Sequence, residues 1–160
     1  MKHSLLIALA GLGLLAVAAT WLFLGPLAAM NLQIWQAFIA WACFFNNGGK
    51  SAGLKTTVIC MSFGAAVGMA SVLLIGQLGG LGALAAPVAV GIGAAVIVLA
   101  AHVPLLSAIP ASVYGFASIA GLILLKGTPA AEAIVPTILS IVVGALFGWL
   151  SEQVAGKLTK

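Results

Sequence analysis

Charged side chains are nearly missing from this chain. It has no arginine and no aspartate, its only carboxylate side chains are Glu132 and Glu152, and charged residues make up 5% of its 160 positions. Soluble domains carry about 25% charged residues, so a surface of this composition would not stay dissolved in water. Hydrophobic residues make up 64% of the chain. The composition therefore predicts a protein that lies in a lipid bilayer.

The same scarcity argues against several classes of function. No carboxylate lies in the interior of a hydrophobic segment, because Glu132 and Glu152 fall at the two ends of the last one. Proton relays, voltage sensors and cation sites place charged groups at membrane depth, at a cost of about 2.5–3.5 kcal/mol each. The only histidines are His3 and His102, and a Ser-His-Asp triad cannot form without aspartate. Cys43 and Cys60 form no CxxC or Cys/His cluster, which argues against a disulfide or a metal site. We expect no enzymatic activity, no cofactor and no metal.

Six hydrophobic segments cover most of the sequence. Because a helix needs about 20 residues to cross a bilayer, six helices use about 120 positions and leave only short connections. The first run exceeds the about 7–15 residues of a signal-peptide core, so we expect it to be retained as a span. Residues 1–160 then form a single integral membrane domain. The expected spans are Leu5–Leu24, Leu32–Asn47, Leu54–Gln77, Leu81–Ala101, Leu105–Leu125 and Ala131–Glu152.

The two halves of the chain resemble each other. A shift of 75 residues places Trp41 on Phe116, and a shift of 80 places Thr57 on Thr137. A loop insertion at Lys126–Ala130 accounts for the five-residue difference. Because each copy holds three spans, the second copy must be inverted in the membrane. We therefore expect an all-α, polytopic fold of six transmembrane helices in two inverted three-helix repeats, which cover about 5–80 and 81–155.

The lysines predict the orientation of the chain. With the N-terminus in the cytoplasm, only Lys126 lies outside, and the other five lie inside, as the positive-inside rule requires: Lys2, Lys50, Lys55, Lys157 and Lys160. Both termini are therefore expected to be cytoplasmic. The lysines form no basic run, which argues against nucleic-acid binding. His102 falls at the inner end of the fourth span, where it is either a pH-sensitive gate or an ordinary interfacial side chain.

Glycines recur at one spacing in both halves. Gly64-x-x-x-Gly68 and Gly144-x-x-x-Gly148 occupy equivalent positions on the third and sixth spans. Lipid tails are as apolar as leucine, so helices associate in membranes through small residues that let their backbones approach. We interpret the four glycines as helix-packing positions, and the alternative is that they line a solute path.

The second span has an unusual composition. It carries aromatic residues on roughly one helical face and amides at its two ends: Trp35, Phe38, Trp41, Phe44, Phe45, Gln33, Gln36, Asn46 and Asn47. It is short, at about 25 Å, so it is either a short spanning helix or a re-entrant one. Its counterpart, the fifth span, starts around Pro110, which favours the first turn of a helix. Corresponding interrupted helices point to a transport path at the repeat interface.

Short motifs in a set order give the chain a family resemblance. They include Trp35-x-x-Phe38, Gly48-Gly49 and Gly53-Leu54-Lys55 in the first half, and Leu105-Leu106-Ser107-x-x-Pro110 and Gly144-x-x-Phe147-Gly148 in the second. Over roughly residues 5–152, the chain resembles the YcdZ-like family of small bacterial inner-membrane proteins, which carry a domain of unknown function. The resemblance implies a multi-span protein of the bacterial inner membrane. The chain departs from the family at Lys50–Ala52, which we expect to lengthen the loop after the second span.

We expect a channel or uniporter for a small uncharged or weakly polar solute, because inverted halves without interior charge suit a solute that needs no counter-charge. The path would run between the second and fifth spans. Its residues would be Phe38, Trp41, Phe45, Tyr114 and Phe116 as constrictions, Asn46, Asn47 and Ser112 as hydrogen-bonding groups, and Pro110 at the start of the fifth span. We also expect a homo-oligomer, because Gly/Ala faces are exposed.

Two alternatives stay open. One is a non-transporting membrane protein that docks a partner or binds a lipid or hydrophobic ligand. The other is a sodium-coupled transporter that works without a carboxylate.

Overall fold

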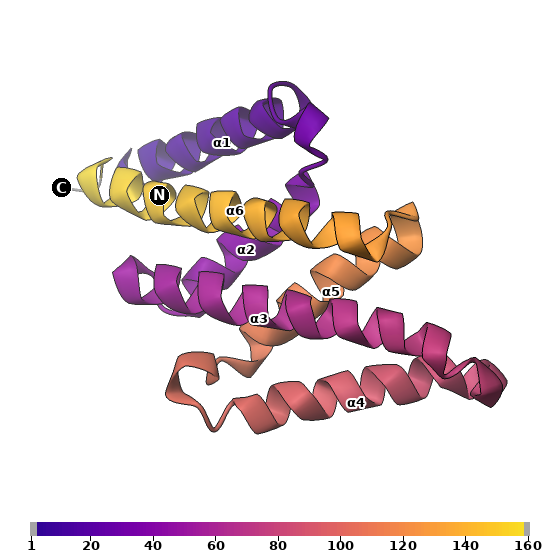
Figure 1. The fold of residues 1–160 in the computed structure, drawn as a ribbon. Helices are drawn as coiled ribbons and strands as arrows, with labels where there is room; N and C mark the ends of the chain where they lie inside the picture. Colours follow the sequence, from indigo (N-terminus) through magenta and orange to yellow (C-terminus); the bar gives the residue numbers. More distant parts are fainter. Residues whose placement is uncertain (1–2, 159–160) are drawn as a thin grey trace.

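A computed structural model describes the backbone of residues 3–158 and the side chains of residues 11–157. The described part is all helical and contains no β-strand (Figure 1). Its α-helices are α1 (His3–Leu24), α2 (Ile34–Asn46), α3 (Lys50–Gln77), α4 (Ala85–Ala100), α5 (Ile109–Lys126) and α6 (Ala130–Leu158), and short 3-10 segments form at Ala28–Met30, Gly79–Leu84 and Pro104–Leu106. The expected all-α fold is confirmed, and each of the six expected segments overlaps one of these helices.

Four segments of the described chain are long and apolar enough to cross a membrane: Lys50–Gln77, Gly79–Ala100, Ile109–Lys126 and Ala130–Lys157. The second of these changes direction at Gly82, where φ is 53°, so α4 itself starts only at Ala85. α1 has 22 residues, although its side chains are described only from Gly11. These helices indicate a multi-pass membrane protein.

α2 is too short to cross a bilayer by itself. Its 13 residues make about 20 Å of helix, against about 30 Å of hydrocarbon. Its ends, Gln33 and Asn47, therefore need protein partners for their polar groups, because irregular backbone at membrane depth is tolerated only when it is buried or lines a polar cavity.

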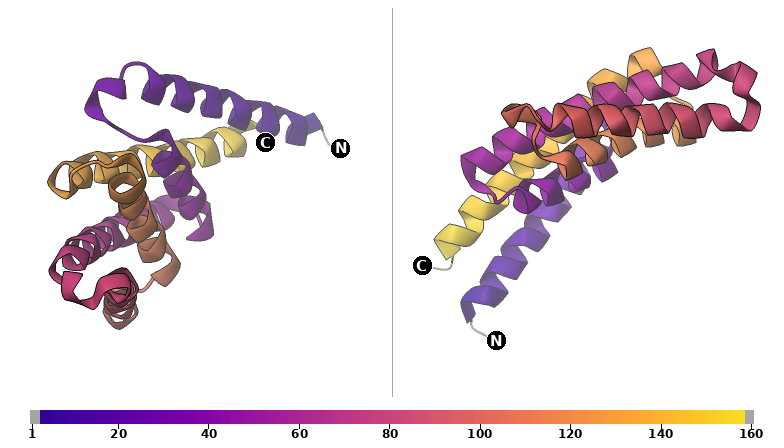
Figure 2. Two further views of the ribbon diagram at one scale, coloured as in Figure 1. Left: turned by 90° about the vertical axis from the view of Figure 1, so that its right-hand side faces the viewer. Right: turned by 90° about the horizontal axis from the view of Figure 1, so that it is seen from below.

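The helices form two layers. α3 and α6 lie side by side and antiparallel, with α4 beside α3 and α1 beside α6 (Figure 1). Behind them lie α2, which packs mainly on α6, and α5, which packs mainly on α3 (Figure 2). The two ends of the chain lie at the same end of the molecule, which is also where α3 begins and α6 ends.

The expected loop extension at Lys50–Ala52 is wrong. α3 begins at Lys50, so these residues form its first turn. The chain turns at Gly48, Gly49 and Lys50, which have φ values of 84°, 66° and 57°. The Glu152 carboxylate then accepts a hydrogen bond from the Lys50 backbone N–H at 2.8 Å and so caps the start of the helix.

The closest helix contacts are made at glycines. A Cβ atom placed on Gly64 would overlap the Ser112 backbone in α5, and one placed on Gly144 would overlap the Ala37 backbone in α2. Gly68 faces Ile119 across the α3–α5 contact and Gly148 faces Phe44 across the α6–α2 contact, at 2.7 and 2.9 Å from such a Cβ. In α5, Gly115 meets the Met61 backbone in the same way. The helix pairs therefore approach backbone to backbone.

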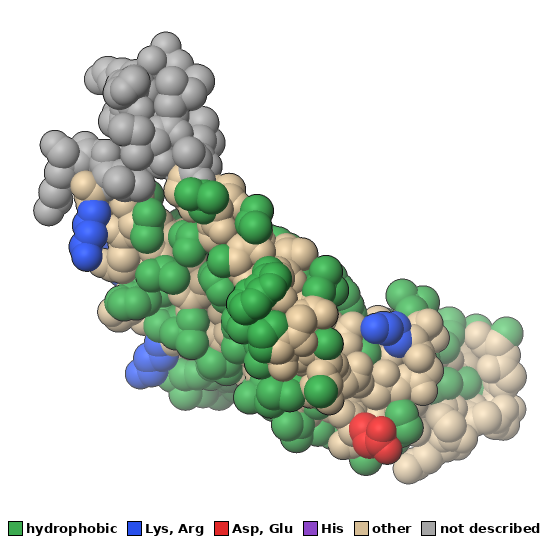
Figure 3. All heavy atoms as spheres, turned by 90° about the horizontal axis from the view of Figure 1, so that it is seen from above, with side chains coloured by type: hydrophobic (Ala, Val, Ile, Leu, Met, Phe, Trp, Pro, Cys, Tyr) green, Lys and Arg blue, Asp and Glu red, His purple; other side chains and the backbone are tan. Residues whose placement is uncertain are grey.

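The outer surface is largely apolar, and Figure 3 shows hydrophobic side chains over much of the face it presents. Leu14, Trp21, Leu99 and Leu125 are all more than half exposed. Such a surface fits contact with lipid tails. Basic side chains lie toward the ends of the molecule instead, and Lys2 and Lys160 lie outside the described residues.

We expect Gly144→Ala to destabilise the fold by about 1–3 kcal/mol, because the added methyl group must push α6 away from Ala37. Gly64→Ala should cost a similar amount at the α3–α5 contact. Gly91→Ala is the matched control, since nothing lies within 4 Å of a Cβ at that helical position. Thermal unfolding of the purified variants in detergent measures the effect, and equal melting temperatures for Gly144→Ala and Gly91→Ala would contradict it.

Candidate functional site

One face of α2 carries polar side chains into the protein. Gln33, Gln36, Cys43 and Asn47 recur at spacings that put them on one side of a helix, with Ala40 between them. Gln36, Ala40 and Cys43 are fully buried, and Gln33 is 7% exposed. We call these four polar residues the α2 polar face. Asn47 is partly exposed, and the burial of the other three polar residues is the first sign of a site.

Gln36 joins three helices at a single point. Its Nε2 donates to the Ser118 carbonyl oxygen of α5 at 2.9 Å and to the Thr137 hydroxyl of α6 at 3.2 Å. Its Oε1 is buried without a hydrogen-bond partner among the described residues, and the same holds for the Ser118 and Ser112 hydroxyls. An unpaired polar atom is costly away from water, so Gln36 Oε1 stands out among the buried groups of the described chain.

A similar pair lies near the other end of α2. Asn47 donates from Nδ2 to the Thr57 hydroxyl at 2.9 Å and to the Cys43 sulfur at 3.4 Å. Thr57 and Thr137 are both fully buried and occupy equivalent positions in the two halves of the sequence. We call Gln36–Thr137 and Asn47–Thr57 the two amide–threonine pairs. Both amides come from α2.

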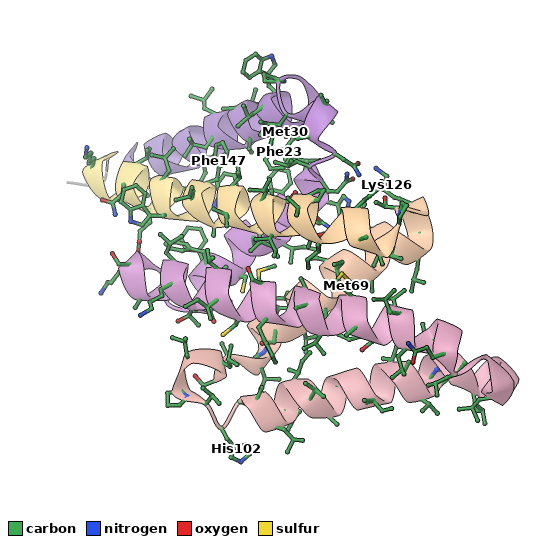
Figure 4. The ribbon with its side chains drawn as sticks, in the orientation of Figure 1. Phe23, Met30, Met69, His102, Lys126 and Phe147 are labelled. Atoms are coloured by element: carbon green, nitrogen blue, oxygen red, sulfur yellow. The ribbon has the colours of Figure 1, made fainter. Side chains whose placement is uncertain are left out.

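Lys126 closes one end of the α2 polar face. Its Nζ donates to Gln33 Oε1 at 2.9 Å, and the Gln33 amide in turn donates to the Asn31 carbonyl and side-chain oxygens at 2.7 and 3.0 Å (Figure 4). The Gln33 backbone N–H donates to Ser140 of α6 at 2.9 Å. A pocket of about 370 Å³ lies beside this network and includes Phe23 in its wall. Gln33 thus ties α2 to α5, α6 and the loop before it.

α6 holds the opposite end of α2 and the start of α3. The Trp41 indole N–H donates to the Ser151 hydroxyl at 3.0 Å, and Ser151 donates to the Gly148 carbonyl oxygen. The next residue, Glu152, lies directly under Gly49, where a Cβ would come within 2.6 Å of its carboxylate oxygen. Because Gly49 also combines φ 66° with ψ −158°, only glycine fits there.

The residues expected to form a pore lie in several places. Phe38, Phe45 and Tyr114 are 38–45% exposed on the outside of the molecule. Asn46 and Tyr114 share a groove of about 410 Å³ between α2 and α5. Phe38, Trp41 and Phe45 line a separate groove of about 300 Å³ beside α1, which contributes Leu12.

The remaining expected residues lie nearer the interior. Trp41 is 7% exposed and stacks on Phe38 and Phe147, with ring centroids 5.9 and 5.7 Å apart. Ser112 is buried against Gly64, and the Phe116 ring lies close to Gly93 of α4. Pro110 lies in the first turn of α5 and is exposed. Asn47 takes part in an amide–threonine pair. The structure therefore does not gather the expected pore residues around one space.

Sequence reasoning missed Gln36, Thr137 and Ser118 as site residues. The sequence analysis counted Gln36 among the amides at the ends of the second span and assigned the pore to the aromatic residues of that span. Two signals were available in the chain. The helical phase of Gln33, Gln36 and Asn47 marks a buried polar face, and the repeat aligns Thr57 with Thr137. Together they point to the interface that the structure forms.

We expect Gln36→Met and Thr137→Val to show a coupling energy of about 0.6 kcal/mol, with an upper bound of about 1.7 kcal/mol, the range found for hydrogen bonds between membrane helices. Gln36→Met combined with Thr57→Val, in the other pair, should be additive. Unfolding of the four proteins of each cycle in mixed micelles gives both values. Additivity in the first cycle as well would contradict the hydrogen bond.

Comparison with known proteins gives a family and no activity. Among the described residues, no group of three or more His, Cys, Asp or Glu is placed to hold a metal ion.

No curated protein and no solved structure matches the chain. A family model described as "Protein of unknown function (DUF1097)" matches residues 10–156. This match does not test the name YcdZ-like, which stays an interpretation. The chain belongs to the DUF1097 family of proteins of unknown function.

Proposed function

We propose that the six helices form two inverted repeats, residues 5–80 and 81–155. The packing supports this pairing, because α3 packs on α5 as α6 packs on α2, and α4 flanks α3 as α1 flanks α6. The glycine contacts agree: Gly64 meets Ser112, and Gly144 meets Ala37. The 80-residue shift relates the two glycines, and the 75-residue shift relates their two partners. A path between the repeats would then pass the α2 polar face.

We propose that the protein is a channel or uniporter for a small uncharged, polar solute in the bacterial inner membrane. The observation that carries this proposal is Gln36, a fully buried amide whose Oε1 has no hydrogen-bond partner among the described residues. An N–H or O–H group of a solute would complete its hydrogen bonds. Asn47 and Thr57 would offer a second stop about 16 Å away along α2, at 1.5 Å per residue.

The surroundings of the two pairs favour a neutral solute moved without coupling. The buried polar residues of the described chain are glutamines, serines and threonines, and none carries a charge. An ion would lose its hydration there without a counter-charge, and a proton would find no carboxylate. Ala40, Met61 and Ile141 are fully buried in one apolar cluster. On this proposal they would close the path, so the described state would be the occluded one and conduction would need these side chains to separate.

Flux into proteoliposomes tests the proposal. The wild-type protein should raise the uptake of at least one of urea, glycerol, ammonia and short-chain acids above that of protein-free vesicles. Gln36→Met should lower this flux about tenfold, because one solute hydrogen bond worth about 1.4 kcal/mol is lost. Gln77→Met, at the exposed end of α3, is the control and should keep the flux. Absence of wild-type flux for every solute would reject the conduit and leave the non-transporting alternatives, including ligand or partner binding.

We infer that both termini face the cytoplasm. Lys50, Lys55 and Lys157 lie toward the end of the molecule where α1 begins and α6 ends, and Lys126 lies toward the opposite end (Figure 4). The positive-inside rule assigns the end with more lysines to the cytoplasm. The homo-oligomer stays a prediction based on the exposed small residues.

Cysteine labelling checks the orientation. In a background without Cys43 and Cys60, Lys126→Cys should react in intact cells with a maleimide that cannot cross the inner membrane. Lys157→Cys should react only after that membrane is opened. The reverse pattern would place the termini outside.

A further inference from the structure

A pocket of about 450 Å³ opens where α3 begins and α6 ends. It is lined by Lys50, Ser51, Trp149, Glu152, Gln153, Gly156 and Lys157. Two ammonium groups border it, and within the described chain neither Lys50 Nζ nor Lys157 Nζ forms a hydrogen bond or an ion pair. The pocket lies at the end of the molecule that carries most of the lysines, and no residue of the two amide–threonine pairs lines it.

The one acidic group of the pocket is already engaged. Glu152 Oε2 accepts the Lys50 backbone N–H at 2.8 Å, and its other oxygen lies under Gly49. Its charge there is stabilised by the positive end of the α3 dipole. The backbone at this end of α3 is therefore occupied, and an incoming anion would be held by the two lysine side chains.

An apolar strip leads from the pocket along α6. Leu146, Trp149 and Leu150 are 47%, 38% and 40% exposed. They lie on the same side of α6 as Gln153 and Lys157, because these positions are three or four residues apart. Along this face of α6, apolar side chains and the Trp149 indole are followed by Lys157. A membrane helix that leaves the hydrocarbon core and enters the headgroup region shows the same order of side chains.

We propose that this pocket binds an anionic phospholipid, with the phosphate between Lys50 and Lys157 and an acyl chain on Leu146, Trp149 and Leu150. Lysine binds phosphate as a point charge, and basic pockets between helices at the membrane surface suit anionic headgroups. The Ser51 hydroxyl and the Gln153 amide add neutral hydrogen-bonding groups for a hydroxylated headgroup such as glycerol. This site is independent of the proposed conduit.

Native mass spectrometry of the full chain with phosphatidylglycerol and phosphatidylcholine tests the proposal. The wild-type protein should retain phosphatidylglycerol at least tenfold better than Lys50→Gln/Lys157→Gln does, while phosphatidylcholine retention stays equal. The matched control is Lys55→Gln, compared with Lys157→Gln alone: each variant removes one charge, Lys55 does not line the pocket, and Lys55→Gln should bind like the wild type. Circular dichroism establishes that the variants keep their helices, and Lys157→Gln alone replaces the double variant if that protein does not fold.

Two results would overturn the site. Equal loss of phosphatidylglycerol in Lys157→Gln and Lys55→Gln would mean general attraction to a basic protein. Full competition by glycerol 1-phosphate at concentrations similar to those of the lipid would mean a site for a soluble phosphate, because the apolar strip would then contribute nothing. Retention that depends on the pocket lysines and resists glycerol 1-phosphate supports the lipid.

Discussion

The whole arrangement depends on two places where helices touch backbone to backbone. In lipid, burying leucine against leucine brings no hydrophobic gain, so close approach and dispersion must hold helices together. Gly64 allows α5 to lie against α3, and Gly144 allows α2 to lie against α6. These crossings create the second layer and determine which side of α2 faces inward. The hydrogen bonds of Gln36 to α5 and α6 exist only because α6 has no side chain at Gly144, so the polar chemistry of the protein depends on its glycines.

The two halves of the chain differ in their polar side chains. At the positions of α5 that correspond to Gln36 and Asn47, the 75-residue shift finds Ala111 and Leu122. α2 therefore supplies the amide of both pairs, while each half supplies one threonine. A small rotation of α2 would break or make both pairs together, whereas α5 could move without touching either amide except through the Ser118 carbonyl. One short helix thus carries the polar contacts of the interface, and its counterpart provides an apolar wall.

The helices could be predicted from the sequence, because long apolar runs broken by Gly, Pro and Lys mark spans directly. The start of α3 could not, since it depends on Glu152, which lies 102 residues further along the chain. The interpretation of the aromatic face of α2 is the more instructive case. In a soluble protein Phe38 and Phe45 would turn inward, but lipid is as apolar as a protein core, so these two side chains face outward while Trp41 and Phe44 of the same helix are buried. In such a chain, an aromatic side chain does not by itself mark the interior.

The short length of α2 also bears on how the protein is made. This helix of 13 residues carries buried amides, and its principal partner α6 follows at a distance of about a hundred residues, as the 101-residue separation of Gln36 and Thr137 shows. At about 5–20 residues per second, the ribosome needs about 5–20 s to synthesise that stretch. For most of this time the Gln36 amide has neither Ser118 nor Thr137 to bond. During membrane insertion, α2 must therefore be kept out of contact with lipid, or stay at the water interface, until α6 has been synthesised and can pack against it.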